Sequence, residues 1–118
     1  MDDNQILIKF KDEIIEILRI LSEKDFKRLK DKGYMGRLTQ LEILKTLEDF
    51  HCQYITLPEE VLANLIPIKV NNKTTSNCWY LDIDLWCNGE KSDLTLSLLL
   101  EEKAHNNLTI QIQDLHVL

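Results

Sequence analysis

Two carboxylates and two aromatic rings share one face of a predicted strand near the C-terminus. Asp82 and Asp84 stand between Tyr80 and Trp86, each two residues from the next. Side chains two residues apart on a β-strand point to the same face. Neighbouring carboxylates can attract a basic protein, hold a divalent cation or act as an acid–base pair. Because exposed tryptophan is favoured at interfaces, we interpret this face as protein-binding.

A predicted hairpin continues the same face onto the next strand. Asn88-Gly89 is a hairpin signal, because both turn residues there need positive φ. A register in which the chain folds about Gly89 and Glu90 gives three cross-strand pairs: Asp84 with Thr95, Asp82 with Ser97, and Trp86 with Asp93. The candidate partner-binding residues are Tyr80, Asp82, Asp84, Trp86, Asp93 and Thr95. An antiparallel sheet that merely has one wet face would carry the same residue types, so a solvated face is the alternative.

The other residues that often do chemistry form no catalytic or metal-binding motif. The histidines are scattered along the chain, at His51, His105 and His116. The cysteines are odd in number and lack C-x-x-C spacing, at Cys52, Cys78 and Cys87. We therefore expect reduced thiols, and no disulfide, metal, cofactor or enzymatic activity.

Charge and hydropathy limit the partners. The formal net charge of −6 repels nucleic acid and attracts basic proteins. The basic residues between Lys24 and Arg37 are diluted by aspartates, so we do not expect nucleic-acid binding. No apolar run is long enough to cross a bilayer, and the acidic N-terminus does not resemble a secretory signal. These features predict a cytoplasmic protein.

The N-terminal half predicts the helices that would support the sheet. Apolar residues recur at helical spacing, widened by Ile15 and Leu18, at Leu7, Phe10, Ile14, Ile17 and Leu21. Two capping-box patterns, Ser22 with Asp25 and Thr39 with Glu42, predict further helix starts. The first of these helices would run over 23–31, and the second would bury Leu41, Leu44, Leu47 and Phe50.

Shorter elements follow, and then the sheet. We predict a strand over 53–56, a helix over 58–65, a brief strand over 68–70 and a polar loop over 71–77. The inward residues of the first long strand are Trp79, Leu81, Ile83, Leu85 and Cys87. The last strand would turn Leu108, Ile110 and Ile112 inward and Thr109, Gln111 and Gln113 outward. The predicted fold is one α+β domain over 1–118, with N-terminal helices packed on one face of a C-terminal antiparallel β-meander.

Three segments of the C-terminal half resemble a family of small, uncharacterised bacterial proteins. These segments are Asp84-Leu85-Trp86, Ser92-Asp93-Leu94-Thr95-Leu96 and Asp114-Leu115-His116-Val117-Leu118. In that family the hairpin reads Gly-Arg-Ser, whereas this chain has Gly89-Glu90-Lys91-Ser92. The order of elements is also similar to that of NTF2-like and cystatin-like folds, whose sheet face takes ligands or partner proteins. The resemblance implies no particular activity.

Two functional hypotheses follow from these observations. In the first, the chain is a protein-binding domain, and our sharpest version is an immunity protein that neutralises a basic bacterial toxin domain. In the second, Asp82, Asp84 and His116 line a pocket for a small ligand or a reaction. A homodimer that pairs two sheet faces is a third possibility. A closed pocket would favour the second hypothesis, and an open face would favour the first.

Overall fold

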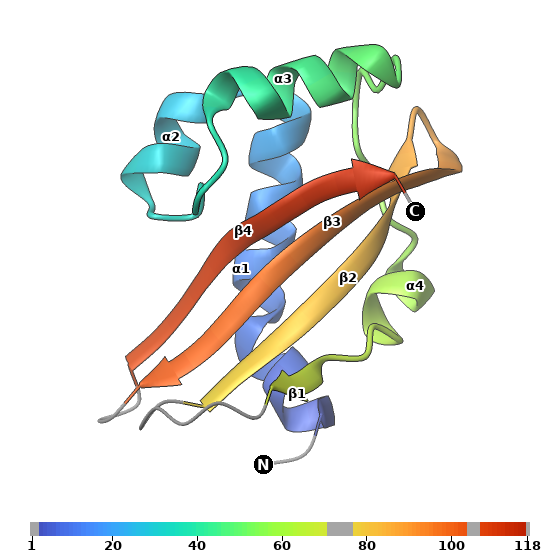
Figure 1. Cartoon of the computed structure of the whole chain (residues 1–118). Helices are drawn as coiled ribbons and strands as arrows, with labels where there is room; N and C mark the ends of the chain where they lie inside the picture. Colours follow the sequence, from blue (N-terminus) through green and yellow to red (C-terminus); the bar gives the residue numbers. More distant parts are fainter. Residues whose placement is uncertain (1–2, 71–76, 104–106, 118) are drawn as a thin grey trace.

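A long N-terminal helix lies behind a four-stranded antiparallel sheet in the computed structural model, which describes residues 3–70, 77–103 and 107–117 (Figure 1). The helices are α1 (Asp3–Glu23), α2 (Phe26–Asp31), α3 (Gln40–Asp49) and α4 (Glu59–Ala63). The strands, in spatial order, are β1 (Ile68–Val70), β2 (Asn77–Cys87), β3 (Glu90–Lys103) and β4 (Asn107–Val117). The predicted α+β class is confirmed. Most of the predicted 71–77 loop, and His105, lie outside the described residues.

The core lies between α1 and the inner face of the sheet. The predicted helical stripe is buried, at Leu7, Phe10, Ile14, Ile17 and Leu21, whereas Ile15 is exposed. The sheet contributes alternate buried residues that include Trp79, Leu81, Ile83, Leu96 and Leu98. Burying one such side chain contributes roughly 1.5–3 kcal/mol, so this shared core fixes which face of the sheet is left outside.

One of the two predicted capping boxes is present. Thr39 caps α3, its hydroxyl accepts from the Glu42 N–H at 3.1 Å, and the Glu42 carboxylate accepts from the Thr39 N–H at 3.1 Å. The other prediction is wrong, because α1 continues through Ser22 and Asp25 alone caps α2.

The buried face of α3 also differs from the prediction. It is formed by Ile43 and Leu47. Leu41, which we expected to be buried, is exposed, and Leu44 and Phe50 are only partly buried. Apolar residues lie on more than one face of α3, so their spacing alone did not identify the face that packs against the core.

The β2–β3 turn consists of Asn88 and Gly89, as their hairpin signal predicted, whereas the predicted register placed the fold one residue later. Both have positive φ, 56° and 85°, as a two-residue hairpin turn of this kind requires. The predicted pairs Asp82–Ser97 and Asp84–Thr95 are present. Beyond them the register shifts, and Trp86 pairs with Lys91 rather than with Asp93.

The side chain of Ser92 satisfies the backbone where the β2–β3 register shifts. Its hydroxyl donates to the Leu85 carbonyl at 2.7 Å and accepts from the Leu94 N–H at 3.2 Å. These two hydrogen bonds explain how β2 and β3 remain paired although their register is irregular between Asp84 and Trp86.

A second irregularity in β4 reverses the inside–outside pattern of its last residues. The register with β3 shifts by one residue, because Leu98 pairs with Ile112 but Ser97 pairs with Asp114. Strict alternation from Ile112 would turn Asp114 inward. Instead Leu115 is buried, and Asp114 joins the outer face.

The α2–α3 loop covers the middle of the free edge of β4 (Figure 1). The Ile112 N–H donates to the Tyr34 carbonyl at 2.7 Å, and Nε of Arg37 donates to the Gln113 carbonyl at 3.0 Å. Gly36, with φ +64°, passes so close to the Ile112 carbonyl that a Cβ atom would collide with it. This loop therefore holds β4 at its bulge.

Cys52 and Cys87 form a disulfide, so the expectation of three reduced cysteines was wrong. Their separation of 35 residues has no local signature, because the tertiary fold brings them together. Closing a loop of this length stabilises a fold by about 4 kcal/mol in the chain-entropy description. The predicted cytoplasmic location loses the support that it drew from unpaired cysteines.

The segment around Cys52 also hydrogen-bonds to the hairpin end. The predicted 53–56 strand is reduced to a single bridge between Ile55 and Cys87. Oδ1 of Asn88 accepts from the N–H groups of Gln53 and Tyr54 at 3.0 and 3.2 Å, and Nδ2 donates to the His51 carbonyl at 2.8 Å. The hairpin end is therefore fixed by polar contacts as well as by the disulfide.

Candidate functional site

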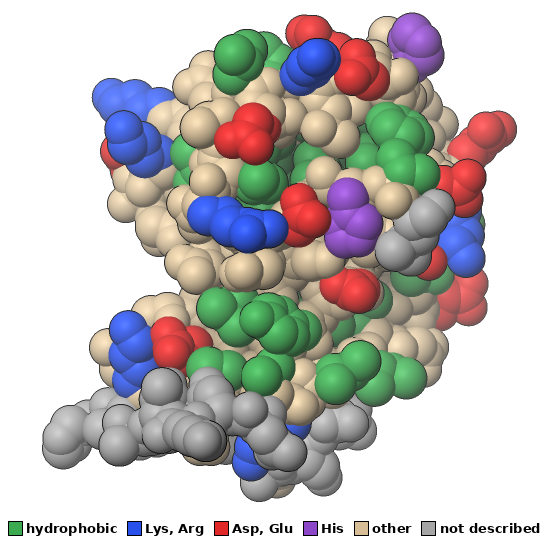
Figure 2. Space-filling model, in the orientation of Figure 1, with side chains coloured by type: hydrophobic (Ala, Val, Ile, Leu, Met, Phe, Trp, Pro, Cys, Tyr) green, Lys and Arg blue, Asp and Glu red, His purple; other side chains and the backbone are tan. Residues whose placement is uncertain are grey.

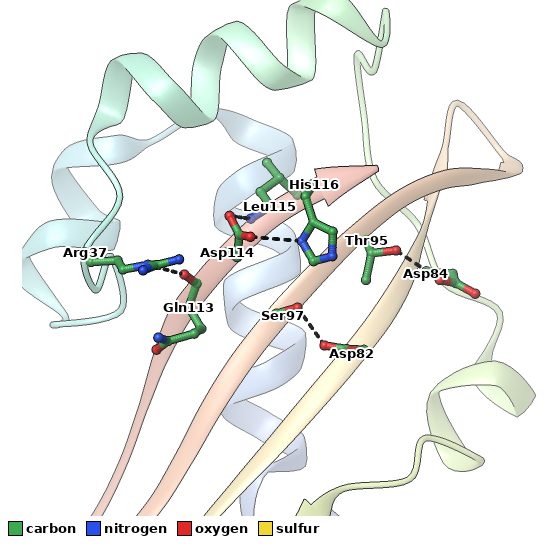
Figure 3. Close-up of polar contacts among 9 residues, drawn as sticks. All are labelled: Arg37, Asp82, Asp84, Thr95, Ser97, Gln113, Asp114, Leu115 and His116. Atoms are coloured by element: carbon green, nitrogen blue, oxygen red, sulfur yellow. Dashed lines mark hydrogen bonds and ion pairs between the residues drawn. The ribbon is translucent and has the colours of Figure 1, made fainter. Parts of the chain in front are cut away.

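The outer face of the sheet carries two polar rows that cross β2, β3 and β4. The register aligns Asp82, Ser97 and Asp114 in the first row, and Asp84, Thr95 and His116 in the second. Figure 3 shows the six side chains on the same side of the sheet. The sheet thus brings three carboxylates and an imidazole into neighbouring positions.

Hydroxyl groups on β3 hold the two carboxylates of β2. The Ser97 hydroxyl donates to Oδ1 of Asp82 at 2.6 Å, and the Thr95 hydroxyl donates to Oδ1 of Asp84 at 3.3 Å (Figure 3). The other carboxylate oxygen of each aspartate takes no part in these two hydrogen bonds. Both residues are exposed. The hydroxyls restrict the carboxylate rotamers, which lowers the entropy lost when a partner binds.

A third carboxylate, that of Asp114, lies on β4. Oδ2 of Asp114 is 3.2 Å from Nδ1 of His116, and Oδ1 of Asp114 accepts from the Leu115 N–H at 2.9 Å. Arg37 reaches the same strand from the α2–α3 loop (Figure 3). Asp114 was missed as a site residue, because the bulge that turns it outward breaks the alternation of the strand. The three-residue spacing from Ile112 to Leu115 is the signal that could have revealed it.

An apolar row borders the polar ones. The register aligns Ile68, Tyr80, Leu99 and Gln111 across the four strands. Ile68 is 66% exposed and Tyr80 is 41% exposed, and Leu99 is half-buried. Figure 2 shows acidic, histidine and hydrophobic side chains together on this side of the molecule.

Four of the predicted site residues lie on the outer face, and they differ in exposure. Tyr80, Asp82 and Asp84 are exposed on the outer face as expected. Thr95 lies on that face but is completely buried, with 0% of its surface exposed, so it can act only through Asp84.

The two predicted residues nearest the turn are displaced by the register shift. Trp86 is half-buried, and its carbonyl accepts from the Thr56 N–H at 3.0 Å. Asp93 is exposed but does not face Trp86. The neighbour of the acidic rows at this end is Lys91, whose Nζ is 3.8 Å from Oδ2 of Asp84.

The cavities described for this chain lie away from the polar rows. One groove of about 540 Å³ runs between α1 and the segment from Ile55 to Leu62. A smaller pocket of about 220 Å³ lies beside Cys52. Neither includes Asp82, Asp84 or His116 in its lining.

The described residues contain neither a grouped metal-binding set of side chains nor a membrane-spanning helix. Among residues 3–70, 77–103 and 107–117, no three histidine, cysteine, aspartate or glutamate side chains are grouped so that they could hold a metal ion. In the same ranges, no helix combines the length and the apolar character needed to cross a membrane.

Comparison with known proteins gives one match. A family model described as a domain of unknown function, DUF7668, matches residues 18–118. No curated protein and no solved structure matches the chain. The matched range includes every residue of the polar and apolar rows.

Proposed function

The chain belongs to the DUF7668 family, a domain of unknown function, and we propose that it binds a positively charged protein through the outer face of its sheet. The observation that carries this proposal is the pair of polar rows. They place Asp82, Asp84 and Asp114 on an outer face that lines neither described cavity. Exposed carboxylates in such a position suit a protein surface better than an enclosed ligand.

The charge of the chain supports a basic partner. The formal net charge of −6 produces a field that accelerates encounter with a positively charged surface. On the outer face, Lys91 lies close enough to Asp84 to offset part of its charge, whereas no described cation lies within ion-pair distance of Asp82. We expect Asp82 to be the main electrostatic contact.

The apolar row supports a stable complex rather than a passing encounter. Electrostatic attraction raises the association rate, whereas buried aromatic and aliphatic anchors slow dissociation. Tyr80 and Ile68 are exposed directly beside the acidic rows, in the position that such anchors would need. Trp86, which we first expected to be an anchor, is half-buried and contributes less.

The narrower proposal is that the partner is a toxin domain and that this chain is its immunity protein. Small size, acidic charge and the open acidic face support this narrower proposal. The pocket hypothesis draws on one specific contact, the 3.2 Å approach of Asp114 and His116. That contact alone gives no enclosed volume in which a substrate would be held away from water.

The test measures association with a positively charged protein, and the products of neighbouring genes are the first candidates to screen. The double variant Asp82→Lys, Asp84→Lys should associate at least about tenfold more slowly at low salt and lose most of the salt dependence. The control variant Asp12→Lys, Asp49→Lys makes the same change of charge at exposed helical positions and should behave more like the native chain. Equal association rates for the two double variants would refute the proposal.

A further inference from the structure

A small pocket opens beside Cys52, one of the two cysteines of the disulfide. Its volume is about 220 Å³, and it is lined by Lys24, Leu47, Glu48, His51, Cys52 and Gln53. Cys87 is not part of the lining. As whole residues, Cys52 is 3% exposed and Cys87 is 9% exposed, so exposure alone would not favour attack at Cys52. The pocket gives a direction of approach to Cys52.

We propose that this pocket is a site of thiol–disulfide exchange, in which a small anionic thiol attacks Cys52 and releases Cys87. The incoming thiolate forms a bond to Sγ of Cys52 while the Cys52–Cys87 bond breaks. The electron pair leaves on Sγ of Cys87, which then takes a proton from water. A second thiolate attacks the mixed disulfide, and the products are two protein thiols and the disulfide of the small thiol.

Charges at the rim select the attacking thiol. Nζ of Lys24 donates to the Gln53 carbonyl at 3.0 Å, which holds the ammonium group at the pocket wall. This charge attracts a thiol that also carries carboxylates. Glu48 lines the same pocket, and its negative charge repels such a thiol. The two residues therefore provide independent electrostatic controls of the same reaction.

A hydrogen-bond acceptor lies beside Cys87 for its reduced form. Its Sγ lies 3.7 Å from the Ser92 hydroxyl oxygen, which can accept a weak hydrogen bond from the thiol once it is protonated. The released segment stays attached to the hairpin, because the contacts of Asn88 with His51 and Gln53 do not involve either sulfur. Exchange can therefore proceed without global unfolding.

The first test locates the mixed disulfide. The oxidised protein is mixed with reduced glutathione, quenched in acid and alkylated, and its peptides are identified by mass spectrometry. We expect the glutathione adduct on Cys52. An adduct on Cys87, or equal adducts on both residues, would overturn the proposal, as would three free thiols in the starting protein.

The second test separates electrostatic selection from general loosening. Lys24→Gln should slow attack by glutathione about threefold, and Glu48→Gln should accelerate it by a similar factor. Both variants should change the rate with 2-mercaptoethanol by a smaller factor, because its attacking thiolate lacks the carboxylates of glutathione. Lys27→Gln, on the exposed surface of α2, is the control for charge change alone. Equal effects on both thiols, or no effect on either, would contradict the proposed role of the pocket.

Discussion

Replacement of Gly36 by alanine should detach the α2–α3 loop from β4. The residue has φ +64°, and its missing side chain would point at the backbone of Ile112, whose carbonyl carbon would lie 3.1 Å from the new Cβ atom. The neighbour is backbone within a strand, so it cannot rotate away as a side chain would. The loop must therefore move, and the contacts that hold the β4 bulge should be lost.

The expected loss in the free energy of unfolding has two parts. A non-glycine residue in the left-handed region costs roughly 1–2 kcal/mol. Displacement of the loop breaks the Tyr34–Ile112 and Arg37–Gln113 hydrogen bonds, each of which contributes about 1 kcal/mol net. The free energy of unfolding should fall by about 3–4 kcal/mol, and the Tm by roughly 12–16 °C for a chain of this size. Urea and thermal denaturation of the oxidised protein measure both quantities.

Gly33→Ala is the matched control. Gly33 also has positive φ, +75°, but no heavy atom lies within 4 Å of the position that its Cβ would occupy. This variant should lose only the conformational part, roughly 1–2 kcal/mol. If Gly36→Ala costs no more than Gly33→Ala, the loop does not need the close approach to β4, and our account of the bulge is wrong.

Three further predictions concern stability. Lys32, whose Nζ lies 3.0 Å from Oε1 of Glu16, holds the pKa of that carboxyl below its ordinary value. The stability lost in Glu16→Gln should therefore be fully present above the ordinary pKa and vanish as the pH falls through the folded pKa; urea titrations across pH 3–7 measure this. His51 has φ 52°, so His51→Gly should raise the free energy of unfolding by about 0.5–1 kcal/mol, and a lower Tm would contradict this. Asn88→Gly keeps the turn conformation but loses the side-chain bonds to 51–54, and should cost about 2 kcal/mol in urea denaturation; an unchanged stability would show that those bonds contribute nothing.

Local sequence patterns predicted the parts of the fold that depend on neighbouring residues. Successive residues of the α1 stripe lie about one helical turn apart, and the capping box of Thr39 joins residues within one turn. The Ser22 pattern looked the same but failed, since Ser22 stays inside α1 and its hydroxyl accepts from the Ile55 N–H at 2.9 Å. A tertiary contact decided the role of that residue, and the sequence near it does not contain that information.

The candidate site was predicted where the two strands are regular. Strict alternation correctly paired Asp82 with Ser97 and Asp84 with Thr95. It failed near Trp86 and Asp114, because each lies beyond a register shift. The burial of Thr95 was also missed. A side chain that points to the outer face is not necessarily exposed, because larger side chains on the neighbouring strands can cover it.

The disulfide could not be predicted from spacing. Cys52 and Cys87 meet only because the chain after α3 returns to the β2–β3 turn. Each cysteine taken alone is a small apolar residue in an unremarkable segment. The pairing depends on the hairpin end and the C-terminus of α3 being adjacent, which is a property of the whole fold.

The bulge in β4 also bears on how this family can vary in length. Deleting the codon for Gln113 would remove the extra residue and restore strict alternation after Ile112. Asp114 and His116 would still lie on the outer face, and Leu115 would still be buried, so both faces of the strand would keep their character. Relatives that lack one residue at this position should therefore keep the same alternation of polar and apolar amino acids in the residues that follow.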